Sequence, residues 1–145
     1  MEKYDLVVIG AGVSGLMASC RAAELGARVL VLEKMPRAGS KLLITGKGRC
    51  NITNTASQSE YFNHIHPRGK FLNYAFSKFF SADIVHLLEK NGVETIEERG
   101  GRVFPKSNKA SEVLNALLKE VENHNVEIYY GAKVQSFFYN ESLVE

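Results

Sequence analysis

Three glycines near the start of the chain have the spacing of a phosphate-binding turn. The stretch Gly10-Ala11-Gly12-Val13-Ser14-Gly15 fits the pattern GxGxxG. In such a turn Gly10 permits the tight bend, Gly12 lets a diphosphate approach the backbone, and Gly15 lets a helix pack closely on a strand. The free N–H groups and the dipole at the start of that helix then face the diphosphate.

An acidic residue follows the glycine motif at the distance that a dinucleotide requires. Glu33 lies about 20 residues further on, where its carboxylate can accept hydrogen bonds from the ribose hydroxyls of an adenosine. A carboxylate there would repel a 2′-phosphate, so NADP is disfavoured. The predicted contacts of this site are Gly10, Gly12, Val13, Ser14, Gly15, Glu33 and Lys34.

A strand, a helix and a second strand must position these residues. The apolar run Tyr4–Ile9 predicts a buried strand, Val13–Leu25 predicts a helix ended by Gly26, and Arg28–Leu32 predicts a parallel partner strand. Together they form one βαβ unit of the usual length, about 30 residues. Because every part occurs in order, the alternative of a turn that needs glycine only for packing is disfavoured.

The rest of the chain predicts further elements around a long loop at residues 34–54, which is rich in Gly, Lys and Thr. We expect helices over 71–80 and 82–90 (capped by Ser81 and stopped by Gly92), a hairpin of 93–97 with 102–104, an amphipathic helix from 110 (capped by Ser107 or Asn108), a third parallel strand over 126–130, and a strand over 134–139 that turns at Asn140-Glu141 into 143–144.

These elements predict an α/β, Rossmann-like domain of three layers. Its parallel sheet has the strand order 3-2-1 and carries a small antiparallel excursion. We divide it into residues 1–54 (βαβ fingerprint and loop), 55–106 (helical and hairpin insert) and 107–145 (helix, third strand and start of a β-meander). Because the sequence stops just inside the returning strand, we interpret it as the first part of a longer, doubly wound sheet.

Composition excludes several other classes of protein. The 18 Lys and Arg residues are scattered among 16 acidic residues, giving a net charge of +2, so no basic stripe predicts a nucleic-acid partner. Apolar runs such as Leu6–Ile9 are far shorter than the roughly 20 residues that span a bilayer. With no signal peptide and no membrane segment, we expect a cytoplasmic protein.

Cysteine and histidine predict neither a redox pair nor a metal centre. Cys50 has no second cysteine nearby, so packing under its loop is favoured over redox chemistry. His64 and His66 could chelate a metal, but no third ligand is apparent, and a surface loop is favoured.

The glycine motif alone does not distinguish FAD from NAD, but three later blocks resemble one family. They are GSKLLITGKGRCNITN at 39–54, RVFPKS at 102–107 with Lys109-Ala110, and GAKV at 131–134. In this order they resemble the bacterial NAD(FAD)-utilizing dehydrogenases, or aminoacetone-oxidase-like FAD-dependent oxidoreductases. The resemblance covers essentially the whole chain, and the GKGRCNITN string is its most specific part.

The resemblance implies a glutathione-reductase-like FAD fold in which the flavin runs along residues 46–51. Glycines there would let the backbone approach the ring, while Asn51 and backbone amides satisfy its polar atoms. Arg49 and Lys41 would donate to diphosphate or flavin oxygens, and the backbone at Val134 would meet the adenine. The implied cofactor contacts are Lys41, Gly46, Gly48, Arg49, Cys50, Asn51 and Val134; for Lys47 a solvated loop face is favoured.

The predicted function is that of an FAD-binding segment of a flavin-dependent oxidoreductase. A hydride would pass to or from flavin N5, with an unidentified small-molecule substrate and with NAD(P)H or oxygen as electron partner. Two alternatives stay open: an NAD-binding dehydrogenase domain, and an inactive, truncated flavoprotein fragment. The family's chains are several hundred residues long, with an inserted substrate domain and a late glycine-rich segment that this sequence lacks. No residue is identified as a catalytic acid or base.

Overall fold

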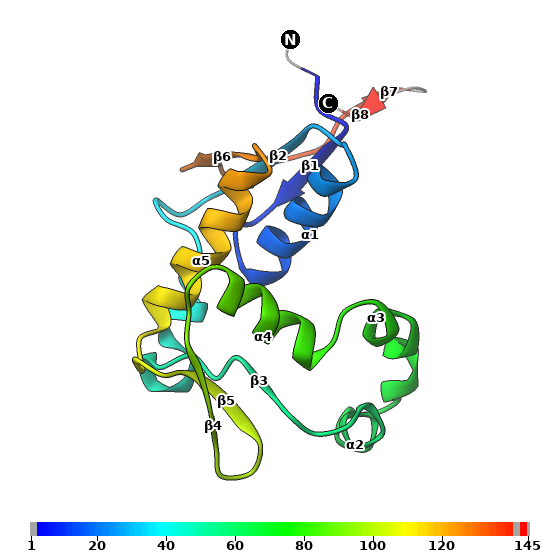
Figure 1. Cartoon of the computed structure of the whole chain (residues 1–145). Coiled ribbons are helices and arrows are strands. Elements are labelled where there is room, and N and C mark those ends of the chain that lie inside the picture. Colours follow the sequence, from blue (N-terminus) through cyan, green and yellow to red (C-terminus); the bar gives the residue numbers. More distant parts are fainter. Residues whose placement is uncertain (1–2, 141–142, 145) are drawn as a thin grey trace. The chain divides into compact units, whose positions relative to one another are not determined.

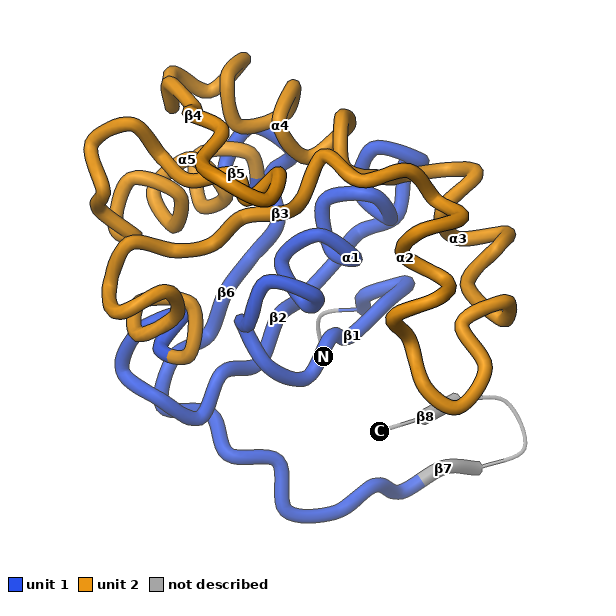
Figure 2. The backbone as a smooth tube through the Cα atoms, turned by 90° about the horizontal axis from the view of Figure 1, so that it is seen from below, with its two compact units in different colours: residues 1–40, 121–145 blue, residues 41–120 orange. Residues whose placement is uncertain are grey.

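The computed structural model describes residues 3–140 and 143–144. These residues form two compact units, coloured separately in Figure 2. Unit 1 comprises residues 1–40 and 121–145, and unit 2 comprises residues 41–120. The three-part division at residues 54 and 106 stays a prediction.

Unit 1 is built on a parallel, three-stranded sheet with a helix packed against it (Figure 1). Its elements are β1 (Leu6–Ile9), α1 (Val13–Glu24), β2 (Val29–Glu33) and β6 (Glu127–Tyr130). The strands run in the order β1-β2-β6, with Leu6 opposite Val29 and Glu33 opposite Tyr130. The predicted Rossmann-type α/β fold and its strand order 3-2-1 are therefore confirmed.

Burial explains why β2 is the central strand. Its residues Val29, Leu30 and Val31 are all buried. By contrast, β1 was predicted to be buried but is mostly exposed, because it lies at the edge of the sheet. Helix α1 packs on β1 and β2, and Leu16 on this helix is fully buried. A buried side chain of this size contributes about 1.5–3 kcal/mol. The helix ends as predicted, because Gly26 adopts φ +92° and the chain turns back there.

Unit 2 contains short helices and a small antiparallel sheet. Its elements are the 3-10 helix η1 (Leu42–Gly48), β3 (Thr53–Asn54), α2 (Gln58–His64), the 3-10 helix η2 (Gly69–Leu72), α3 (Asn73–Lys78), α4 (Ser81–Lys90), β4 (Thr95–Glu98) and β5 (Arg102–Pro105). Helix α5 (Ala110–Asn123) follows, and its last residues belong to unit 1.

The antiparallel sheet of unit 2 has one strand more than the predicted hairpin. Strands β4 and β5 pair antiparallel around Gly100 and Gly101, both at positive φ, as the glycine pair indicated. The two-residue strand β3 adds to the other edge of β5, so the sheet order is β3-β5-β4. A strand this short has no alternation that a sequence could reveal.

One helix was missed, and two helix predictions need correction. Helix α2 was not predicted, although Ser57 and Glu60 form a capping box at its start. The helix predicted over 71–80 is divided into η2 and α3. Helix α4 begins at Ser81 rather than after it, and Asp83 accepts the N–H of Phe80 (2.6 Å), so Ser81 is not the cap.

The last part of the chain differs from its prediction in extent. Strands β7 (Tyr139–Asn140) and β8 (Leu143–Val144) pair antiparallel, as expected. The predicted strand over 134–139 is mostly absent, because residues 132–138 have no regular secondary structure and Phe137 and Phe138 are exposed. Of the predicted turn at Asn140-Glu141, Glu141 lies outside the described residues.

Candidate functional site

The glycine motif of unit 1 forms the turn between β1 and α1. Gly10 has φ +99°, and its N–H donates to the Leu32 carbonyl (2.8 Å), which extends the pairing of β1 with β2. A methyl group added at Gly15 would lie 2.0 Å from the Gly10 carbonyl oxygen. The glycine at position 15 is therefore required for the close approach of α1 to the turn.

The start of α1 presents backbone donors. Gly12 is its N-cap, no side chain caps the helix, and no acidic residue lies in its first turn. An added Cβ at Gly12 would meet nothing within 4 Å, so the space in front of this residue is open. Val13 and Ser14 in the first turn are exposed. Open space before an uncapped helix N-terminus suits a diphosphate.

Glu33, at the end of β2, is joined to this turn by its carboxylate. Its Oε2 accepts the N–H of Ala11 (2.7 Å), and its Oε1 accepts the N–H of Met35 (2.8 Å). The residue is only 9% exposed. Each oxygen keeps a second lone pair, so the carboxylate can also receive a ribose hydroxyl.

Sequence reasoning missed the residues that hold the turn in place. Ala11 is fully buried, and its carbonyl accepts the N–H of Gly39 (2.9 Å), so residues 34–39 fold back over the motif. The positive φ of Gly39, +65°, permits this return. The glycine at position 39 was a sequence signal for this return of the chain.

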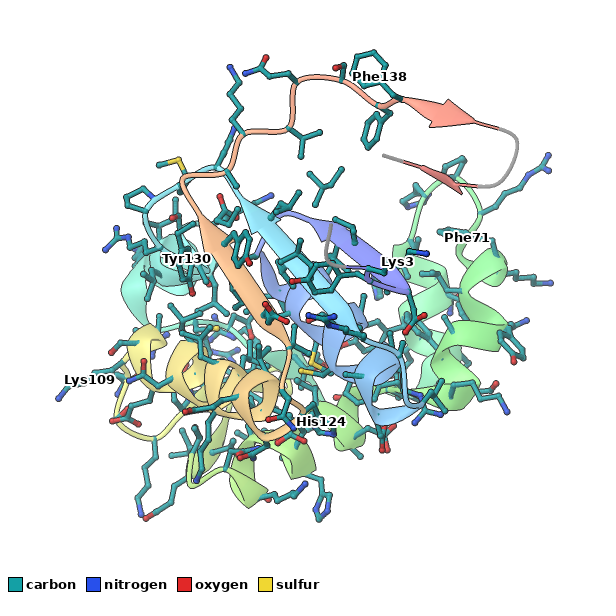
Figure 3. All side chains as sticks on the ribbon, turned by 90° about the horizontal axis from the view of Figure 1, so that it is seen from above. Lys3, Phe71, Lys109, His124, Tyr130 and Phe138 are labelled. Atoms are coloured by element: carbon teal, nitrogen blue, oxygen red, sulfur yellow. The ribbon has the colours of Figure 1, made fainter. Side chains whose placement is uncertain are left out.

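The remaining predicted residues of unit 1 lie near the same strand end. Lys34 follows Glu33 and is exposed. The Glu33 carbonyl accepts the N–H of Ala132 (2.9 Å), which keeps the chain after β6 beside β2. Tyr130 marks this end of β6 in Figure 3, and Val134 follows it by four residues. The structure thus places the glycine turn, Glu33 and Lys34 at the carboxyl ends of β1 and β2, and the role of Val134 stays a prediction.

The predicted residues of unit 2 lie on a loop with an unusual backbone. Gly46, Lys47, Gly48 and Cys50 all have positive φ, from 54° to 85°. Two of these residues are not glycine, and an L-residue in this conformation costs about 1–2 kcal/mol. A side chain at Gly46 would collide with the Asn51 nitrogen (2.9 Å), so the loop is closely folded on itself.

Arg49 is the most connected side chain of this loop. Its Nη1 and Nη2 donate to the two carboxylate oxygens of Glu98 (2.7 and 3.3 Å), and Nη1 also donates to Asn108 Oδ1 (3.1 Å). The guanidinium lies over the Phe104 ring, 4.1 Å from its centre. The hydrogen bond from Arg49 is the main reason why the pKa of Glu98 lies below its usual value.

The other predicted loop residues differ in exposure. Lys41 and Asn51 are exposed, whereas Cys50 is 5% exposed. Burial raises the pKa of the Cys50 thiol, against a smaller lowering by a hydrogen bond with Thr45. This environment suits the packing role that the sequence favoured for Cys50.

Three further observations concern other kinds of site. Within residues 3–140 and 143–144, no three His, Cys, Asp or Glu side chains come together as metal ligands. Across the same residues, no helix combines the length and apolar character needed to cross a membrane. A surface pocket at the end of α4, lined by Glu89 and residues 92–95, contains none of the predicted site residues.

The family model described as the HI0933-like protein Rossmann domain matches residues 4–144. The chain is also 31% identical over 142 residues to the ribosomal RNA dihydrouridine synthase of Escherichia coli, which covers 98% of this chain and 35% of that protein. It is 34% identical over 131 residues to the 3-dehydro-bile acid delta(4,6)-reductase of Clostridium scindens, covering 89% and 31%. The chain spans about a third of the length of these relatives.

Solved structures share its fold at low sequence identity. The 3-ketosteroid-delta4-(5alpha)-dehydrogenase of Rhodococcus jostii matches with a TM-score of 0.68 and 18% identity, covering 96% of this chain and 40% of that one. A flavocytochrome c3 fumarate reductase matches with a TM-score of 0.65 and 20% identity, covering 97% and 29%. From its family match and its fold, the chain belongs to the HI0933-like family and is an FAD-binding Rossmann domain of the kind found in flavin-dependent oxidoreductases.

Proposed function

We propose that this chain supplies the FAD site of a flavin-dependent reductase. The observation that carries the proposal is the bridge from Glu33 to the glycine turn, where Oε2 accepts the Ala11 N–H at 2.7 Å. This bridge fixes the carboxylate beside the start of α1. The part that binds a ribose and the part that binds a diphosphate are therefore held together before any ligand arrives.

Within unit 1, the contacts divide by the chemistry of the cofactor. Gly10, Gly12 and Gly15 shape the turn, and the N–H groups of Val13 and Ser14 donate hydrogen bonds to the diphosphate. Glu33 and Lys34 bind the adenosine ribose, and the backbone at Val134 meets the adenine. The last of these assignments comes from the family resemblance, and it is compatible with the irregular course of residues 132–138, in which Val134 is half-buried.

Within unit 2, we assign the flavin to the loop that carries the GKGRCN sequence. Lys41, Gly46, Gly48, Arg49, Cys50 and Asn51 are the proposed contacts, through their backbone or side chains. When bound, FAD supplies hydride transfer at N5. The role of the loop is to place backbone N–H donors against the ring. Its residues with positive φ suit this role, because successive N–H groups in such backbone can point toward one acceptor.

The names of two relatives indicate the reaction class. A dihydrouridine synthase and a delta(4,6)-reductase both reduce carbon–carbon double bonds. We propose that the parent activity of this chain is likewise the reduction of a double bond conjugated to a carbonyl group. An oxidase activity of the aminoacetone-oxidase type is the second candidate, favoured by the GKGRCNITN block.

The visible absorption spectrum of the purified chain, before and after addition of FAD, tests the cofactor assignment. We expect flavin bands near one equivalent of protein, released as FAD on denaturation. A colourless protein that ignores FAD but binds NAD would establish the NAD-binding alternative. A colourless protein that binds neither would identify an inactive fragment.

The reaction class is tested on the FAD-loaded protein, reduced under anaerobic conditions. Uridine-containing RNA, a 3-dehydro-bile acid with 4,6 double bonds, and oxygen are offered separately, and flavin reoxidation is followed. Reoxidation by either alkene supports the reductase and distinguishes the two substrate types. If oxygen reoxidises the flavin and neither alkene does, the oxidase is supported instead. The oxidised protein should then form hydrogen peroxide when an amine substrate and oxygen are added.

A further inference from the structure

We propose that Glu98 is a positioning residue for the flavin-facing loop, which it holds through Arg49. The proposal rests on the assignment of residues 46–51 to the flavin. It concerns a residue on β4, outside that loop and 49 positions away from Arg49 in the sequence. Glu98 itself is not proposed to touch the cofactor.

The loop needs an external hold because its backbone is strained. Lys47 and Cys50 both have positive φ without being glycine, at 58° and 60°. Such conformations persist only where the surroundings impose them. Local hydrogen bonds contribute, from the Cys50 N–H to the Thr45 carbonyl (3.1 Å) and from the Arg49 N–H to the Gly46 carbonyl (3.2 Å). Both end within the loop, so they do not fix it to the rest of unit 2.

Two connections fix the loop to the hairpin. Beyond the loop, the N–H of Ile52 donates to the Val103 carbonyl (2.8 Å) on β5. Inside it, the Arg49 side chain lies on Phe104 and forms a two-pronged hydrogen-bonded ion pair with Glu98. A planar guanidinium held on an aromatic face and by a carboxylate has its orientation fixed, which a single lysine contact would not achieve.

The same contacts change the role of Arg49. Its positive charge is matched by Glu98, and two of its nitrogens already donate to protein oxygens. We therefore assign the Arg49 side chain to shaping the loop rather than to donating to the flavin or the diphosphate, and only its backbone remains a proposed contact of the cofactor. Lys41, which is exposed at the start of η1, is left as the proposed cationic donor to the cofactor.

Variants at Glu98 separate positioning from simple stability. Glu98→Gln keeps the shape but removes the charge, whereas Glu98→Asp keeps the charge on a shorter stem. Glu97→Gln is the matched control, because Glu97 is the preceding residue on β4 and is exposed. Each protein is titrated with FAD, its bound-flavin spectrum is recorded, and its apo form is melted and digested with trypsin.

We expect Glu98→Gln to raise the Kd for FAD at least tenfold, to shift the visible bands of any bound flavin, and to accelerate cleavage after Lys47 at least fivefold. Glu98→Asp should restore part of each effect, and Glu97→Gln should leave all three within twofold of the original protein. Equal trypsin cleavage in Glu98→Gln and the original chain would overturn the proposal, even without FAD. Equal changes in both Gln variants would indicate a general surface effect and would also overturn it.

The positioning role of Glu98 can be wrong even where the proposed function is right. If the original chain binds FAD and Glu98→Gln binds it equally well with the same spectrum, only the positioning role is wrong. If the original chain binds no FAD, the proposed function fails, and the positioning role falls with it whatever the trypsin digestion gives.

Discussion

The two proposed parts of the cofactor site are built by different means. In unit 1, the site consists of a turn of glycines and one carboxylate, and the bridge between them joins residues of a single βαβ unit. In unit 2, a strained loop is held by the side chains of Glu98, Phe104 and Asn108, which come from later in the sequence. The turn of unit 1 therefore depends on glycines without side chains, and the loop of unit 2 depends on the side chains that contact Arg49.

The difference indicates where each part is vulnerable. The turn of unit 1 is disrupted if a side chain is added at Gly15, because the backbone of Gly10 leaves no room for it. The loop of unit 2 fails if an interaction is removed, because its conformation is unfavourable by itself. Substitutions in the two units should therefore have effects of different kinds and sizes.

The largest effect is expected from Gly15→Ala. The new Cβ would lie 2.0 Å from the Gly10 carbonyl oxygen and 3.3 Å from a methyl group of Val8. Backbone cannot move aside as a flexible side chain can, so we expect a loss of about 3 kcal/mol or more. Soluble yield and the thermal unfolding midpoint measure it.

Gly12→Ala is the control for this prediction. Its Cβ meets no atom within 4 Å, and Gly12 has an ordinary φ of −77°. We expect apo stability within about 0.5 kcal/mol of the original, but weaker FAD binding, because the methyl group enters the space proposed for the diphosphate. A Gly15→Ala protein as stable as Gly12→Ala would contradict the packing argument.

An intermediate effect is expected from Glu33→Gln. The amide keeps one acceptor oxygen but turns an NH₂ group toward the N–H of Ala11 or Met35, so one buried hydrogen bond is lost. The expected cost is about 1–3 kcal/mol, measured by urea unfolding, with reduced FAD binding. Glu24→Gln, in an exposed pair with Arg21, should change stability by less than about 0.5 kcal/mol. Equal midpoints for the two variants would speak against the bridge.

Sequence patterns predicted unit 1 much better than unit 2. The βαβ unit depends on apolar runs, glycine spacing and an acid at a fixed distance, all of which are local. Its missed contacts are made by the backbone of Ala11, whose N–H donates to the Glu33 carboxylate and whose carbonyl accepts the N–H of Gly39, and the residue type of Ala11 does not predict them. Periodicity similarly predicted α5 but missed α2, whose seven residues include no buried side chain.

The arrangement of unit 2 could not be read from spacing. The loop was assigned to the cofactor by family resemblance alone, and its contacts with FAD stay a prediction. Positive φ at Lys47 and Cys50 has no residue-level signal, since neither type favours that conformation. The pair of Arg49 with Glu98 depends on how a hairpin folds back over a loop, which a single sequence does not specify.

The smallest effect concerns pH and the ion pair of unit 2. The hydrogen bond from Arg49, then the charges of Arg49 and Arg102, keep the pKa of Glu98 below its ordinary value. A lowered pKa in the folded state means that the pair stabilises fully above the ordinary glutamate pKa of about 4.3, and progressively less as the pH falls through the lowered value. The stability advantage of the original chain over Glu98→Gln should therefore shrink between neutral and acidic pH.

Unfolding midpoints of the two proteins, measured side by side across that range, check this prediction. Other carboxylates with lowered pKa, such as Glu94 beside Lys106 and Glu60 beside Ser57, are present in both proteins and cancel in the difference. A difference that stays constant with pH would show that the Glu98 charge does not stabilise the folded chain.

Cys50 gives the loop an internal reporter of its own opening. The thiol is buried, and its raised pKa keeps it protonated at neutral pH, so the closed loop should react very slowly with alkylating reagents. Labelling of Cys50 would then require the loop to open, so the rate at which its peptide is modified, measured separately from the peptide of Cys20, would report how much of the time the loop is open. A time course of Cys50 modification, followed by mass spectrometry with and without FAD, would thus measure local opening of the loop.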